Sequence, residues 1–471
     1  MYLAHAKVML WSMRWLTIQA FNATCMLVCA FVSISSAVRV LSFGRGTVWT
    51  AMAHIITAVI GSGVLSLAWS VAQLGWVGGP TAIVFFAGVT VVQSSLLADC
   101  YISRDEDGHG VVVRNKSYVQ AVRLYLGEKS RLFCGFFLSI SLFGSSVVYT
   151  LTSATSMRAI QKANCYHTEG HGAPACSAAG GGSDVYYMVL FGVAQLVLSQ
   201  IPDFHNMAWL SIFAAVMSFS YSFIGFGLGA AKVIENGVIK GAIGGIALAS
   251  TTQKVWRVAQ ALGDIAFAYP FSLVLLEIED TLRSPPAESE TMKKASRASI
   301  AVTTFFYLGC GCLGYAAFGD ATPGNLLTGF GFYEPYWLID LANLCVVLHL
   351  LGGYQVYSQP AFALAEQWFA TEGSSVDLNV FRLCYRTAYV AAATAVAVWF
   401  PYFNQVVGLI GAFSFWPLAI HFPVEMYITQ AQVAPWTARW LAIRAFSAAC
   451  LLVCAFASLG SAVGVFGSKE S

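Results

Sequence analysis

The chain has few charged side chains for its length. Only 10% of its 471 residues are Asp, Glu, Lys or Arg, whereas 58% are hydrophobic. A water-soluble domain carries about 25% charged residues, so this chain cannot cover a water-facing surface of its own size. Its formal net charge of +2 gives no basic surface for nucleic acid, and we expect no such partner.

Residue patterns typical of enzymes are also missing from the sequence. It holds no H-E-x-x-H pair and no recognisable pairing of a nucleophile with a base. We therefore expect a protein that is not an enzyme and that uses no cofactor and no metal.

Long apolar runs fill most of the chain instead. A helix that crosses a bilayer needs about 20 apolar residues, and eleven segments after residue 45 approach or exceed this length. They are 48–76, 80–103, 131–156, 185–202, 207–231, 256–279, 298–318, 337–364, 383–400, 404–423 and 440–466. The sequence therefore predicts an all-α polytopic membrane protein with eleven transmembrane helices.

Lys and Arg in the loops predict the orientation of these helices, because cytosolic loops carry an excess of both. The loops 104–131 and 280–297 are rich in Lys and Arg, whereas 75–79, 319–336 and 401–403 contain neither. The lysines of the 232–255 loop do not fit the rule. The pattern as a whole places residue 45 in the cytosol and the C-terminus outside.

The N-terminal segment 1–44 duplicates the last transmembrane helix. Of the first 40 residues, 23 are identical to the residue found 425 positions later. Two consecutive helices joined by about ten residues cannot both run outward, so this extra apolar helix does not fit beside 48–76 in the orientation of the original. It is inserted the other way, removed as a signal-like segment, held as a peripheral hairpin, or fused from a neighbouring gene copy, which we favour. The domains are then 1–44, a transport domain at 45–466 and a short tail at 467–471.

Two apolar spans are interrupted by glycine at corresponding places. The first contains Gly61-Ser62-Gly63 and the second Gly263-Asp264, each near the middle of its span. Unwound backbone inside a bilayer is tolerated only within protein or along a cavity, and paired breaks in the two halves of a transporter point to its binding site. Free N–H groups at the start of a half-helix suit a carboxylate, and free carbonyls at the end of another suit an ammonium. Helix packing is the alternative use of such glycines.

From Thr47 onward the chain closely resembles plant amino acid permeases of the amino acid/auxin permease family. The resemblance is carried by long runs, which include His54 to Trp69, Ser199 to His205, Lys254 to Ala268 and Pro323 to Trp337. It implies the LeuT-type fold, with two inverted five-helix repeats plus one helix, and the import of amino acids together with protons. Val148 departs from the glycine usual in the family, which bears on the range of substrates.

The resemblance and the two breaks together define a candidate substrate site. Its predicted members are Ile60, Gly61, Ser62, Gly63, Tyr149, Gly263, Asp264 and Phe267. The resemblance places the Tyr149 hydroxyl near the substrate carboxylate, whereas a buried tyrosine with any other partner is the alternative. Phe267 covers the pocket or simply packs.

Two residues are candidates for carrying the coupled proton. Acidic groups in the middle of a membrane span are costly and usually functional, so Asp264 is the first candidate. Two alternative roles for Asp264 are binding of the substrate ammonium and a hydrogen bond that only holds the backbone. His54 lies about two turns before the first break, and its imidazole is either a proton relay or a hydrogen-bonded structural residue.

Cys165 and Cys176 differ from the other ten cysteines, which lie in apolar spans. Both fall in the predicted outer loop 157–184, on the oxidising side of the membrane, where a disulfide is expected. Two histidines in this loop have no recognised zinc spacing, so we predict no metal site.

The sequence as a whole predicts a proton-coupled amino acid symporter of neutral or broad range in the plasma membrane, which works by alternating access. Its partners are the amino acid, protons and the lipid bilayer; the oligomeric state is not predicted. The alternatives are a carrier of auxin or another small organic acid, and an amino acid sensor that does not transport.

Overall fold

The computed structural model of the chain describes residues 46–104, 112–170, 176, 182–201, 208–248, 250–330, 336–371 and 377–467. The predicted N-terminal repeat at 1–44 and the tail after residue 467 lie outside these described residues.

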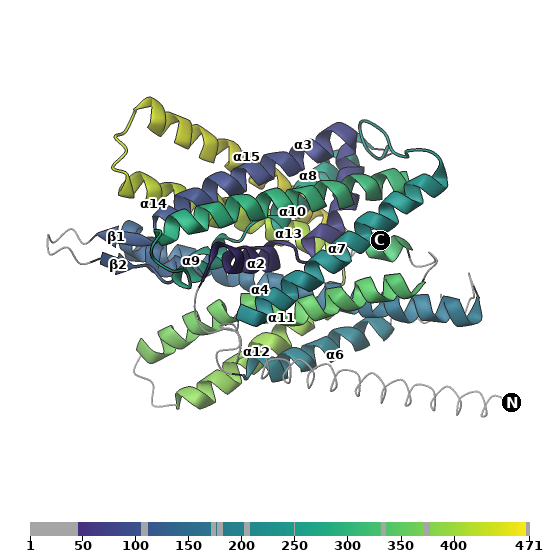
Figure 1. Cartoon of the computed structure of the whole chain (residues 1–471), viewed down its shortest axis with the longest axis horizontal. Coiled ribbons are helices and arrows are strands. Elements are labelled where there is room, and N and C mark those ends of the chain that lie inside the picture. Colours follow the sequence, from purple (N-terminus) through teal and green to yellow (C-terminus); the bar gives the residue numbers. More distant parts are fainter. Residues whose placement is uncertain are drawn as a thin grey trace.

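Helices run roughly side by side along the long axis of the molecule (Figure 1). They are α2 Val48–Val59, α3 Gly63–Asp99, α4 Tyr118–Glu169, α6 Gly182–Ser199, α7 Ala208–Asn236, α8 Thr251–Ala268, α9 Ser272–Asp280, α10 Glu288–Phe318, α11 Tyr336–Thr371, α12 Leu378–Trp399, α13 Phe403–Ser414, α14 Phe422–Gln430 and α15 Ala438–Gly467. A π-helical stretch, η4 Phe415–His421, joins α13 to α14, and two short 3₁₀ turns, η2 Gly319–Ala321 and η3 Leu326–Phe330, precede α11.

One small hairpin departs from the predicted all-helical fold. Strands β1 Ile102–Arg104 and β2 Val112–Arg114 pair antiparallel, with Ile102 opposite Arg114. The hairpin projects from one end of the helix bundle (Figure 1). The strand β2 and the last residue of β1 fall in the basic segment 104–131, for which the sequence predicts a cytosolic position.

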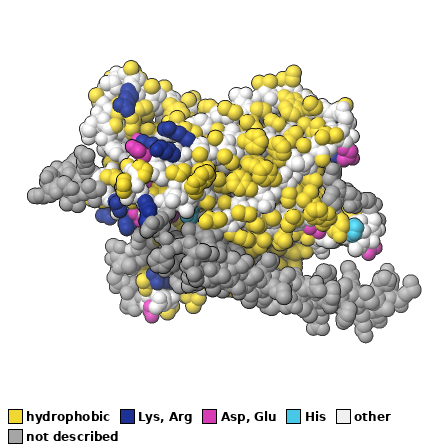
Figure 2. Space-filling view, viewed as in Figure 1, with side chains coloured by type: hydrophobic (Ala, Val, Ile, Leu, Met, Phe, Trp, Pro, Cys, Tyr) yellow, Lys and Arg dark blue, Asp and Glu magenta, His cyan; other side chains and the backbone are white. Residues whose placement is uncertain are grey.

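Length and composition show a polytopic membrane protein. Among the described residues, eight helices are long and apolar enough to cross a bilayer, and α2 and residues 184–199 of α6 form shorter apolar helices. Figure 2 shows hydrophobic side chains over the middle of the visible face, while Lys and Arg gather at the end where Figure 1 places β1 and β2. The sequence predicts a cytosolic position for that end.

The helix α3 contains two spans, because it reverses direction at Gly75. Gly75 has a φ of +80°, which favours glycine, and a Cβ there would lie 2.1 Å from the Ile243 carbonyl oxygen. A Cβ on Gly79 would lie 2.9 Å from the Cα of Val71. Residues eight apart in a straight helix are separated by about 12 Å, so the two halves of α3 fold back on each other, as the separate spans 48–76 and 80–103 predict.

Several helices extend well beyond their predicted apolar spans. The helix α10 begins at Glu288 rather than at residue 298, and α4 continues to Glu169 rather than ending near 156. Apolar runs report only the length of chain in lipid, so the polar turns that continue a helix into water do not appear in them. Cys165 therefore lies in the last turns of α4 and not in a loop.

Ion pairs and a hydrogen bond hold the helices together at the end of the bundle beside the hairpin. Lys293 of α10 pairs with Asp99 at the end of α3, and the Arg114 guanidinium of β2 lies 3.0 Å from the buried Glu288 carboxylate. The Tyr101 hydroxyl donates to the Asp280 carboxylate of α9 over 2.8 Å. These acidic residues mark helix ends, and they fix α3, α9 and α10 to the hairpin.

Candidate functional site

Two membrane-spanning helices of the bundle are interrupted near their midpoints, and we call them rods. The first consists of α2 and the first half of α3, and the second of α8 and α9. The first break lies at Ile60–Ser62, between α2 and α3, as the sequence predicts. The second was predicted at Gly263, and this position is wrong, because α8 is helical through Gly263 to Ala268. The break comes at 269–271, where Pro270 has no N–H to donate and ends the helix.

Hydroxyl groups from α7 satisfy the unwound backbone of the first break. The Tyr221 hydroxyl lies 2.9 Å from the Ile60 carbonyl oxygen and 3.1 Å from that of Gly61. The Ser218 hydroxyl donates to the Ile60 oxygen over 2.9 Å. The carbonyls of Ile60 and Gly61, which the sequence offers to a substrate ammonium, therefore already have donors within the protein, as buried polar groups require.

A single tyrosine connects the two breaks. The Tyr307 hydroxyl of α10 lies 2.5 Å from the Val59 carbonyl oxygen and 2.8 Å from that of Ala268. These two carbonyls end α2 and α8, the half-helices that precede the two breaks. The Tyr357 hydroxyl of α11 donates to the Ala58 oxygen over 2.9 Å. Tyrosine side chains thus hold the carbonyl ends of both interrupted rods.

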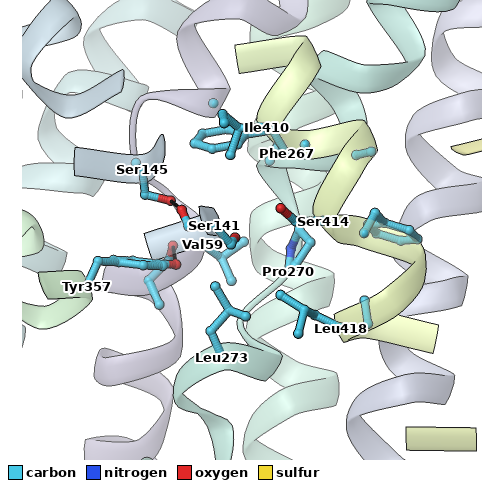
Figure 3. Close-up of a pocket in the computed structure, with 18 of the residues that line it drawn as sticks. Val59, Ser141, Ser145, Phe267, Pro270, Leu273, Tyr357, Ile410, Ser414 and Leu418 are labelled. Carbon is cyan, nitrogen blue, oxygen red and sulfur yellow. Dashed lines mark hydrogen bonds between the residues drawn. The ribbon is translucent and has the colours of Figure 1, made fainter. Parts of the chain in front are cut away.

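A cavity lies between the two breaks, and residues from α2, α3, α4, α8, α9, α11 and α13 line it. In Figure 3, Phe267 and Ile410 lie together at one end of the cavity and Leu273 and Leu418 at the other. The lining also contains polar side chains. They include Ser62, Ser141, Ser145, Tyr149, Ser272, Tyr357 and Ser414.

The half-helices α3 and α9 both begin at this cavity. Gly63, the first residue of α3, and Ser272, the first of α9, are among its lining residues. The first N–H groups of a helix have no acceptor within it, and the N-terminal end of the helix dipole is positive. Two such ends at one cavity favour a negatively charged group there.

Three buried serine hydroxyls in the lining have no hydrogen-bond partner among the described residues. They are Ser62 between the half-helices, Ser272 at the start of α9 and Ser414 at the end of α13. A buried hydroxyl normally has a partner, and each can donate one hydrogen bond and accept others. The cavity therefore combines free donors and acceptors with two apolar ends, which suits a small zwitterion with an apolar side chain.

The predicted site residues divide into two groups. Gly61, Ser62, Gly63, Tyr149 and Phe267 all line the cavity. Those of the second group are not among its lining residues; they are Ile60, Gly263, Asp264 and His54.

Gly263 serves close packing between α8 and α13. A Cβ on it would lie 2.4 Å from the Gly408 carbonyl oxygen, and one on Gly411 would lie 2.4 Å from the Gly263 oxygen. Small residues allow membrane helices to approach at this distance. At this position the packing interpretation of the glycine holds.

Asp264 is fully buried beside the same contact. Its Oδ2 atom lies 3.4 Å from the Ser70 hydroxyl of α3, and its Oδ1 atom has no hydrogen-bond partner among the described residues. A Cβ on Gly408 would lie 2.8 Å from Oδ1 and 2.8 Å from the Ser461 hydroxyl of α15. The carboxyl group thus lies where α3, α8, α13 and α15 meet, about one turn from the cavity.

Sequence reasoning missed His349, which lies behind the first break. Its Nδ1 atom lies 2.9 Å from the Ser218 hydroxyl and 3.1 Å from the Ala214 carbonyl oxygen. When Nδ1–H donates to that carbonyl, Nε2 is an acceptor, and it has no partner among the described residues. A Cβ on Gly61 would lie 3.7 Å from Nε2 and 3.4 Å from the Tyr149 hydroxyl. No sequence motif marks this histidine, since only the fold brings α11 to Gly61.

Cys165 and Cys176 form a disulfide, with their Cα atoms 5.7 Å apart. The bond joins the last turns of α4 to Cys176, at the end predicted to be outside, and does not belong to the cavity. Among the described residues, no group of three or more His, Cys, Asp or Glu side chains could hold a metal ion.

Paired interruptions around a central cavity define the class of this protein as a polytopic membrane transporter. The sequence pattern of the family described as "Transmembrane amino acid transporter protein" matches residues 44–466, and the chain belongs to this family. The family consists of transporters and not of enzymes.

Curated relatives and solved structures agree with this assignment. The chain is 56% identical over 443 residues to "Probable amino acid permease 7" of Arabidopsis thaliana, which covers 90% of this chain and 94% of the relative. It is 51% identical to "Amino acid permease 2" of the same plant, over 89% of this chain and 88% of the relative.

Two solved structures show a similar fold at low sequence identity. "Crystal structure of MhsT in complex with L-phenylalanine" is matched with a TM-score of 0.57 at 11% identity, over 88% of this chain and all of that one. A substrate-bound, Na⁺-coupled sialic acid symporter is matched with a TM-score of 0.55 at 12% identity, over 91% and 90% of the two chains.

Proposed function

We propose that this protein imports neutral or a broad range of amino acids together with protons across the plasma membrane. The observation that carries the proposal is the cavity between the two interrupted rods, where the N-terminal ends of α3 and α9 meet unpartnered hydroxyls. The family and the names of its permease relatives supply the substrate class.

The substrate carboxylate binds at the start of α3, beside Gly61, Ser62 and Gly63. Glycine at both ends of this segment lets a ligand approach the backbone closely, and the free N–H groups with the Tyr149 hydroxyl supply donors. The ammonium lies against the hydroxyl oxygen of Ser414, at the end of α13, because the carbonyls of the breaks already accept from tyrosine and serine.

In this proposal the chain crosses the membrane eleven times: α3 counts as two spans, each broken rod as one, and α13, η4 and α14 together as one. In this arrangement the segment before α2 is cytosolic and α15 ends outside, and the first ten crossings form two inverted repeats of five. Alternating access then requires the two apolar ends of the cavity to open in turn. Phe267 with Ile410 closes the end toward the outside, and Leu273 with Leu418 closes the end toward the cytosol.

The test of this function is the accumulation of a labelled neutral amino acid by cells that lack their own uptake. We expect accumulation that rises when the external medium is acidified and that falls when a protonophore is added. Saturable binding by the purified full chain without accumulation would favour the sensor. Uptake of auxin in preference to amino acids would favour the organic acid carrier.

Replacing Asp264 with Asn is expected to abolish the response of uptake to external pH. Asn keeps the shape of the side chain but cannot bind and release a proton. One proton that moves down a gradient of one pH unit releases about 1.4 kcal/mol, enough for about a tenfold concentration of substrate. Accumulation of substrate is measured with and without a proton gradient. We expect the gradient to raise accumulation in the unmodified protein and not in Asp264→Asn.

Asp320→Asn is the matched control, because this carboxyl is exposed in η2 at the outer end of the bundle. It should keep the response of the unmodified protein. If Asp264→Asn accumulates substrate as well as the control at both pH values, Asp264 is not the proton carrier, although amino acid transport itself would stand.

A further inference from the structure

A second cavity, of about 300 Å³, lies toward the outer side of the bundle. It shares no lining residue with the central cavity, although α3, α4, α8 and α13 contribute residues to both. Its lining residues are Trp69, Thr155, Arg257, Gly324, Asn325, Thr328, Phe403, Asn404 and Gln405. Pockets for small molecules begin at about this size.

Among the described residues that line this cavity, Arg257 is the only one with a charged side chain. It lies on α8, and its Cζ atom is 5.8 Å from the centre of the Trp69 ring of α3. Among the described residues none forms an ion pair with it, whereas its neighbour Lys254 donates to the carbonyls of Gln73 and Ile246. An arginine that has no carboxylate partner within the protein can bind the carboxylate of a ligand. The planar guanidinium donates two parallel hydrogen bonds to the two oxygens of such a group.

Two buried amide groups provide further donors in the same cavity. The side chains of Asn325 and Asn404 are 5% and 7% exposed, and the Nδ2 atom of each has no acceptor among the described residues. The carbonyl end of Asn325 is used, since its Oδ1 accepts from the Leu327 N–H over 3.1 Å. A Cβ on Gly324 would lie 2.8 Å from Oδ1 of Asn404, so the glycine leaves room for that amide.

The arrangement combines one cation outside any ion pair with two unsatisfied N–H₂ groups, and the described lining residues include no acidic side chain. Buried donors normally have acceptors, and hydrogen bonds to a carboxylate are among the strongest. The set therefore favours a small organic anion rather than a cation or an apolar ligand.

We propose that this outer cavity is a receiving site for the carboxylate of the amino acid before it enters the central cavity. The inference rests on the proposed function, since it concerns the same substrate. The substrate carboxylate pairs with Arg257 and accepts from the amides of Asn325 and Asn404, while its ammonium faces the water.

The two cavities lie on a common path along the same helices. Trp69 comes six residues after Gly63 on α3, and Thr155 comes six residues after Tyr149 on α4, which corresponds to about 9 Å along each helix. Phe267 lies between the cavities on α8 and contacts Gly411 of α13 closely, because a Cβ on that glycine would lie 2.6 Å from the Phe267 Cβ. A substrate released from the outer cavity therefore next contacts Phe267, which with Ile410 closes the outer end of the central cavity.

Arg257→Met tests this proposal in cells, with uptake of labelled L-alanine measured over a range of concentrations. We expect the KM to rise about tenfold, since a charged cleft raises the local concentration of an oppositely charged group by at least this factor. The maximal rate should stay close to that of the unmodified protein. The difference in KM should narrow at high salt, which screens this attraction, and Arg257→Lys should restore part of the affinity.

The control removes a different outer cation. Lys232 of α7 pairs with Glu235 and does not line the cavity, so Lys232→Met should leave the KM unchanged. Asn404→Asp is a second variant of the site, because its carboxylate would occupy Arg257 and repel the substrate; it should also raise the KM. The amount of each variant at the cell surface is measured with a tag.

The results separate the two proposals. If the unmodified protein accumulates L-alanine and the KM is unchanged in both Arg257→Met and Asn404→Asp, the receiving site is overturned and the proposed transport stands. A loss of maximal rate without a change in KM would assign these residues a structural role and would also overturn it. An unmodified protein that accumulates no amino acid would overturn the proposed function itself.

Discussion

Replacing Gly63 with Val is expected to abolish amino acid uptake. The Cα of this glycine touches the end of α8, because a Cβ added there would lie 2.9 Å from the Ala268 Cα and 3.0 Å from its Cβ. The obstructing atoms belong to backbone and to a methyl group that cannot turn away. Overpacking of this kind costs about 1–3 kcal/mol, and relief requires the two interrupted rods to separate at the cavity. Uptake of labelled L-alanine, normalised to protein at the cell surface, measures the effect.

Gly88 offers a matched control in the same helix. A Cβ on it would meet nothing within 4 Å, so Gly88→Val adds the same side chain without a clash. We expect this variant to transport as the unmodified protein does. If Gly63→Val transports as well as Gly88→Val, the contact between the breaks is dispensable, and the substrate site proposed beside Gly63 loses its main support.

The sequence predicted the first break correctly and misplaced the second for a physical reason. Gly61 and Gly63, on either side of Ser62, separate α2 from α3 within an otherwise apolar run. The prediction of a break rested on glycine in both halves of the chain. In the second rod the glycine at 263 lies inside a helix and serves its contact with Gly408, while Pro270 ends the helix. A proline removes a donor whatever surrounds it, so it was the stronger signal of the two.

The partners of the breaks could not be predicted from the sequence. Tyr221, Tyr307 and Tyr357 are separated by 161, 248 and 299 residues from the first break carbonyls that they contact. Each lies in an apolar span where a tyrosine is equally suited to packing. Apolar periodicity assigns a residue to a helix, but only the packing of α7, α10 and α11 against α2 decides which hydroxyl reaches which carbonyl.

Replacing Tyr307 with Phe is expected to reduce amino acid uptake about thirtyfold. The hydroxyl lies within hydrogen-bond distance of the Val59 and Ala268 carbonyls, and Phe keeps the ring but removes this donor. The Val59 oxygen still accepts from the Gly61 N–H over 2.9 Å, so the Ala268 carbonyl is the buried acceptor that the change leaves without a donor. A buried group left unsatisfied costs about 1–3 kcal/mol, and about 2 kcal/mol corresponds to a thirtyfold change. Initial uptake rates of labelled L-alanine measure the loss.

Tyr269→Phe separates the hydrogen bonds of Tyr307 from the loss of a hydroxyl in general. Tyr269 lies beside it, with ring centroids 5.1 Å apart, but its hydroxyl contacts the Thr304 side chain at 3.1 Å and no break carbonyl. The Thr304 hydroxyl can turn to another partner, whereas the carbonyls of the breaks cannot turn, so Tyr269→Phe should cost much less uptake. Equal losses of uptake in Tyr307→Phe and Tyr269→Phe would mean that both hydroxyls act through packing. The hydrogen bonds from Tyr307 to the carbonyls of the breaks would then not be needed for transport.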